Sequence, residues 1–79
     1  MLSLADLVPG EIGKICGFRK GHKAYRQKLL AMGIAKGREG TLKRVAPAGD
    51  PVELVFGGSS VTLRKEEAAI IQIEKSNHE

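Results

Sequence analysis

Glycine and proline recur throughout this chain and leave only short runs of Val, Ile and Leu between them. There are ten glycines and three prolines in 79 residues. Proline fixes one backbone angle and glycine tolerates positive φ, so both favour tight turns. A domain of this size buries only about 60% of its unfolded surface, which leaves little room for an enclosed active site. We therefore expect one domain, residues 1–79, with a mainly β fold forming a small barrel.

The expected strands lie between these turn signals. Residues 11–18 do not alternate strictly between apolar and polar side chains, so we expect a bulge near Gly13 or Gly17. Residues 39–46 alternate, and this predicts a half-exposed strand with Gly40, Leu42 and Arg44 on one face. The other expected elements are strands at 52–56 and 60–64 forming a hairpin, a helical turn at 65–69, a closing strand at 70–74 and a frayed tail at 76–79.

One segment, at about residues 22–32, has the composition of an α-helix. Gly33 follows it as the expected C′ residue. At about 100° per residue, Leu29 and Leu30 point to different sides of such a helix. Either one leucine is exposed beside basic side chains, as expected of a protein contact, or a groove buries both. We take as candidates for partner binding Tyr25, Arg26, Lys28, Leu29 and Leu30.

Positive charge is concentrated in the first half of the chain. Residues 1–40 hold eight Lys/Arg against three Asp/Glu, whereas residues 41–79 hold five against six. Such a patch can attract acidic protein surface, lipid head groups or nucleic acid, or it can be a solvated face that maintains solubility. The cluster consists of Arg19, Lys20, Lys23, Arg26 and Lys28, with His22 between them.

No motif of catalysis or metal binding is present. The only histidines are His22 and His78, so we expect no catalytic triad, and no glycine pair completes a phosphate-binding loop. Metal ligands at binding spacing are absent, and we expect no catalytic residues, cofactor or metal site. The single cysteine, Cys16, cannot form an internal disulfide and is expected to be a small core residue.

The N-terminus lacks the basic region of a signal peptide, and no stretch approaches the roughly 20 apolar residues that span a bilayer. We expect a cytoplasmic protein without membrane insertion.

The pattern of residues as a whole resembles the FeoA family, ferrous iron transport protein A. The most specific part runs from Tyr25 to Leu30 and continues with Met32-Gly33-Ile34. One departure is Ala35-Lys36-Gly37, where the family often has Pro-Gly. The resemblance covers nearly the whole chain and rests on Leu4, Leu7, Gly10, Ile15, Gly17, Arg26, Leu29, Met32-Gly33-Ile34, Gly37, Asp50-Pro51, Leu63-Arg64 and Ala68.

The resemblance implies an SH3-like, five-stranded barrel with one inserted α-helix at about residues 22–32. It also implies a non-enzymatic role in bacterial ferrous iron uptake, with FeoB, a membrane transporter that carries a cytosolic GTPase domain, as partner. The family has no agreed binding motif, so the candidate residues rest on the helix argument alone. No nucleic acid is expected as a partner, and self-association through a β edge or the helix stays open.

Two other functions are compatible with the sequence. Residues 36–42 resemble the turn-strand motif of RNA-binding ribosomal and transcription-factor barrels, although aromatic residues for base stacking are scarce. A similar barrel also ends the DtxR-type iron repressors, which predicts at most an iron response through Glu66, Glu67 or a histidine.

Overall fold

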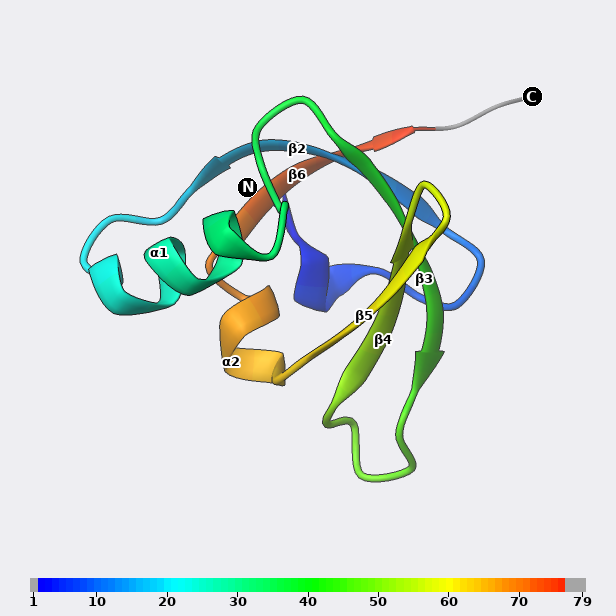
Figure 1. Cartoon of the computed structure of the whole chain (residues 1–79). Coiled ribbons are helices and arrows are strands. Elements are labelled where there is room, and N and C mark those ends of the chain that lie inside the picture. The colour runs from blue at the N-terminus through cyan, green and yellow to red at the C-terminus, as the bar shows by residue number, and fades with distance from the viewer. Residues whose placement is uncertain (1, 77–79) are drawn as a thin grey trace.

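Within residues 2–76, six strands form one antiparallel sheet in the order β1-β6-β2-β3-β4-β5. The computed structural model describes residues 2–76. The sheet curves around the core, and helix α1 lies to one side of it (Figure 1). The elements along the chain are β1 (Leu2–Ser3), the 3₁₀-helix η1 (Leu4–Asp6), β2 (Ile12–Phe18), α1 (Lys23–Ala31), β3 (Glu39–Val45), β4 (Val52–Phe56), β5 (Ser59–Leu63), α2 (Lys65–Ala68) and β6 (Ile71–Ser76).

The sixth strand, β1, was not among the five expected. It has only two residues and pairs through Leu2↔Ile73 and Ser3↔Gln72. Ser3 ends it because its hydroxyl caps η1, accepting a hydrogen bond from the Ala5 N–H at 3.2 Å. Two residues are too few for an alternation pattern to be visible in the sequence.

Two bulges decide which side chains face the core. Between β2 and β6 the register shifts between Ile15 and Gly17, which confirms the bulge predicted near Gly17. In β3 a second shift occurs between Leu42 and Arg44. An extra residue reverses the alternation of a strand, so Arg44 is exposed, and its predicted place on the face of Leu42 is wrong.

The predicted turns and helix end are confirmed. Helix α1 ends in a Schellman motif, in which the Ile34 N–H donates to the Leu29 carbonyl oxygen at 3.0 Å and Gly33 has a φ of 85°. The hairpin of β4 and β5 closes on Gly57-Gly58, with Phe56 opposite Ser59. The closing strand runs from Ile71 to Ser76, so Ser76 belongs to the strand and not to the predicted tail, and residues 77–79 lie outside the described residues.

The core lies between the curved sheet, η1 and the two helices. Gly40 is buried in it, and a Cβ placed there would meet Cε1 of Phe56 at 2.5 Å. The buried apolar residues are Leu4, Leu7, Ile15, Leu29, Ile34, Leu42, Val52, Leu54, Phe56, Leu63, Ala68, Ile70, Ile71 and Ile73. No helix within residues 2–76 is long and apolar enough to cross a membrane.

Candidate functional site

Helix α1 buries only one of its nine residues. Leu29 is fully buried, whereas Leu30 is 44% exposed and Tyr25 37% exposed. Leu29 and Ile34 are joined by the Schellman hydrogen bond, and both side chains are buried in the core. The helix therefore carries an apolar outer surface beside its basic side chains.

This arrangement decides between the two leucines. Leu30 is the exposed one, and the alternative in which both are buried is wrong. Leu29 is wrong as a contact residue, because a side chain inside the core cannot reach a partner. Tyr25, Arg26 and Lys28 lie at the surface, and their role in partner binding stays a prediction.

Lys28 has a structural contact of its own. Its Nζ lies 2.6 Å from Oε2 of Glu67, a buried carboxylate on α2 whose Oε1 accepts the Arg64 N–H at 2.9 Å. The hydrogen bond from Lys28 lowers the pKa of Glu67. The Arg64 N–H and the positive charges of Lys28 and Arg64 lower it too, whereas burial acts to raise it. Lys28 therefore holds α1 to α2, and its ammonium group is less available for contact with a partner.

The basic cluster lines a hollow at the start of α1. The hollow has a volume of about 390 Å³. Five of the six cluster residues predicted from the sequence lie along it, and Leu30 forms part of its wall. The lining side chains that matter here are Arg19, Lys20, His22, Lys23, Arg26 and Leu30.

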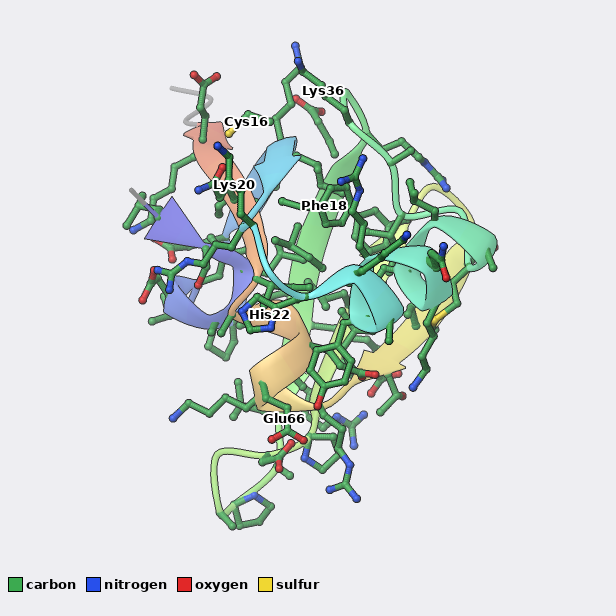
Figure 2. All side chains as sticks on the ribbon, turned by 90° about the vertical axis from the view of Figure 1, so that its left-hand side faces the viewer. Cys16, Phe18, Lys20, His22, Lys36 and Glu66 are labelled. Carbon is green, nitrogen blue, oxygen red and sulfur yellow. The ribbon has the colours of Figure 1, made fainter. Side chains whose placement is uncertain are left out.

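A second hollow, of about 320 Å³, adjoins the first and shares Arg26 and Leu30 with it. We call the two together the α1 groove. Figure 2 looks onto this face: Phe18 extends from β2, Lys36 lies on the loop after α1, and Lys20 and His22 follow the connection into the helix. Of the residues that the structure describes, no Asp or Glu lines either hollow. The second hollow is formed by Cys16, Gly17, Phe18, Arg26, Leu30 and Lys36.

Cys16 is only half-buried, so its predicted place in the core is wrong. It is the residue at which the register of β2 against β6 shifts, and the bulge turns it toward the second hollow. The uneven spacing of Ile12, Ile15 and Phe18 was the signal in the sequence that could have indicated this.

The residues considered for an iron response, Glu66, Glu67 and the histidines, do not form a cluster of metal ligands within residues 2–76. Within residues 2–76 no three side chains of Cys, His, Asp or Glu cluster as metal ligands would. His22 stacks on Tyr25 with ring centroids 6.2 Å apart, and Glu67 is paired with Lys28. His78 lies outside the described residues.

The segment that resembles the RNA-binding turn-strand motif makes internal contacts. Gly37 has a φ of 95° and donates its N–H to the Ile15 carbonyl oxygen at 2.8 Å. The guanidinium of Arg38 lies 5.6 Å from the ring centroid of Phe56 and donates to the Gly33 carbonyl oxygen at 2.7 Å. This segment closes the turn into β3 and packs on the core.

The curved sheet with an inserted helix defines a small SH3-like barrel. The chain belongs to the FeoA family, because the model of the FeoA domain matches residues 2–75. It is 36% identical over 55 residues to a protein of Porphyromonas gingivalis named as a fusion of Fe(2+) transport protein A and the Fe(2+) transporter FeoB. That match covers 70% of this chain and 6% of the fusion protein.

Solved structures show the same fold. A FeoA-like protein from Clostridium acetobutylicum is 34% identical, with a TM-score of 0.86 over 99% of this chain and 92% of that one. The FeoA of Stenotrophomonas maltophilia, complexed with zinc and described as a prokaryotic SH3 domain protein, is 21% identical, with a TM-score of 0.80 over 94% of this chain and 91% of that one. A manganese-dependent transcriptional repressor is 13% identical, with a TM-score of 0.88 over 95% of this chain and 36% of that one. The last two likenesses show the fold alone.

Proposed function

We propose that this chain is a single-domain, cytoplasmic accessory protein of bacterial ferrous iron uptake. It binds the cytosolic region of a FeoB-like transporter and modulates its GTPase or transport activity. Membership of the FeoA family supports the pathway, and the fusion of the two functions in one relative supports the partner. Joining two modules in one chain raises their effective concentration, which is useful when they act together.

The observation that carries the proposal is the exposure of Leu30 beside Arg26, on a helix that buries only Leu29. An apolar side chain with an arginine next to it is the composition that protein interfaces favour. To modulate the transporter, the chain must bind one nucleotide state more tightly than the other, because a partner with equal affinity for both states shifts neither.

The test is binding of the purified chain to full-length transporter and to its isolated GTPase domain, with GDP and with a GTP analogue. Leu30→Gln combined with Arg26→Glu should weaken binding by at least about tenfold, as loss of a central apolar contact and a charge does. The matched control is Val8→Gln combined with Lys65→Glu, which changes an exposed apolar residue and an exposed cation outside α1 and outside the groove. Unchanged affinity of the folded α1 variant would show that another surface binds.

RNA binding has less support from the side chains. Base stacking needs exposed aromatic rings. Phe56 is buried and Phe18 is partly buried against the core, whereas Tyr25 is 37% exposed. Saturable, strongly salt-dependent binding of RNA without binding of the transporter would favour the nucleic-acid function instead.

A further inference from the structure

We propose that the α1 groove binds an acidic segment of the partner protein in extended conformation, added as a strand along the free edge of β2 at Cys16–Phe18. This inference rests on the proposed function and specifies the chemistry and conformation of what is recognised. Two independent features of the groove carry it: its unneutralised charge and its unpaired strand edge.

The charges of the groove are not neutralised within the protein. Ion pairs elsewhere engage Lys28, Lys43, Arg44, Arg64 and Lys75. Eight further cations form no ion pair with any residue of the described range 2–76, and five of these eight line the groove: Arg19, Lys20, Lys23, Arg26 and Lys36. Among residues 2–76 no carboxylate lines the groove, so its charge is complementary to an acidic partner.

The edge of β2 is open at the same place. β2 pairs with β6 along its length, but with β3 only over Ile12–Lys14. Ile15 still exchanges two 2.8 Å hydrogen bonds with the turn before β3, to Gly37 and Arg38. Beyond it, no strand within residues 2–76 lies on this side of Cys16–Phe18, and the second hollow occupies the place. A strand from another protein could continue the sheet there.

Two opposite walls of the groove carry apolar side chains. Leu30 is 44% exposed, and Phe18 packs against the core at the other wall. An added strand directs alternate side chains to opposite faces, so one apolar side chain of the segment could contact Leu30 while its acidic neighbours meet the cations. A lipid surface or a nucleic acid would use the charges but not the strand edge, and for this reason we infer a polypeptide.

The probes are overlapping ten-residue synthetic peptides that cover the cytosolic region of the transporter. We expect an acidic peptide to bind, with weaker affinity at high salt, and to shift the amide NMR signals of Gly17 and Phe18. A copy of that peptide with alternate N-methylated amides should bind at least about tenfold more weakly, because it cannot donate the hydrogen bonds of an added strand. Peptides that bind equally well when N-methylated would overturn the strand-addition model.

The deciding variant is Lys36→Glu, because Lys36 lies on the loop outside α1 and outside the candidate set of the proposed function. It should weaken binding of the full-length transporter by about tenfold, whereas the matched reversal Lys65→Glu should leave it unchanged.

If wild-type protein binds the transporter and Lys36→Glu binds equally well, the groove is not the site, although the proposed function stands. If the transporter does not bind at all, both proposals fail. If no acidic peptide binds, but anionic vesicles or RNA do and Lys36→Glu weakens that binding, the polypeptide assignment is wrong.

Discussion

Lys28 on α1 and Glu67 on α2 form an ion pair of 2.6 Å between residues 39 positions apart in the sequence. The carboxylate is buried, whereas the side chain of Lys28 is 59% exposed. Together with Leu29, this pair fixes the orientation of a helix that otherwise faces solvent. The position of the α1 groove therefore depends on a contact outside the groove.

Replacing Lys28 with methionine should destabilise the protein, because it leaves the buried Glu67 carboxylate with only the Arg64 N–H as a donor. We expect the free energy of unfolding to fall by about 1–2 kcal/mol, which is at the lower end for hydrogen bonds to charged groups because solvent screens the exposed Lys28. Urea denaturation followed by circular dichroism measures this. Lys23→Met, at an exposed α1 position without an ion pair in the described chain, is the control. Equal midpoints for the two variants would contradict a structural role for Lys28.

Stability should decrease in acid in a way that depends on Glu67. The pKa of Glu67 is lower in the folded protein than in the unfolded chain. Its contribution to the free energy of unfolding is therefore complete above the ordinary glutamate pKa, and it is lost as the pH falls through the lowered pKa of the folded state. Glu11, which accepts the Val8 N–H and pairs with Lys75, has its pKa lowered too. Glu67→Gln should therefore flatten only part of the decrease below about pH 4.5 in denaturation series. A decrease identical to that of the wild type would exclude Glu67 as a contributor.

The two adjacent leucines should respond in opposite ways to truncation. Leu29→Ala removes a fully buried side chain and should destabilise the protein by about 2–5 kcal/mol, whereas Leu30→Ala should change stability by less than about 0.5 kcal/mol. Thermal denaturation of both variants measures the contrast. If Leu30→Ala were the more destabilising, the orientation of α1 described here would be wrong.

Gly40 should not tolerate even a methyl group. A Cβ there would lie 2.5–2.9 Å from three atoms of the Phe56 ring, which is itself held in the core. We expect Gly40→Ala to destabilise the protein by about 1–3 kcal/mol through overpacking. Gly58→Ala is the matched control, because a Cβ at Gly58 would meet no atom within 4 Å. Chemical denaturation should rank Gly58→Ala near the wild type, and the reverse ranking would refute the close packing.

The elements with strong local signals were predictable. Gly57 and Gly33 mark a hairpin and a helix end through positive φ angles that glycine adopts most easily, and no distant contact is needed to predict them. The β3 bulge was not predictable in this way. It moves Arg44 out of line with Leu42 because the partner strand sets the register, and a regular alternation in the sequence gives no sign of it.

For the candidate site too, the sequence determined some features and tertiary structure determined the others. The basic residues, the helix and the pair of leucines at different angles follow from residue types and the period of a helix, so the sequence determined that α1 would carry charge and apolar surface together. Tertiary structure decided three other features. It determined which leucine is exposed, it paired Lys28 with Glu67, and it placed Cys16 and Lys36 in the lining of the groove. Each depends on contacts between segments far apart in the chain, and the periodicity of a single segment contains no information about the surface it meets.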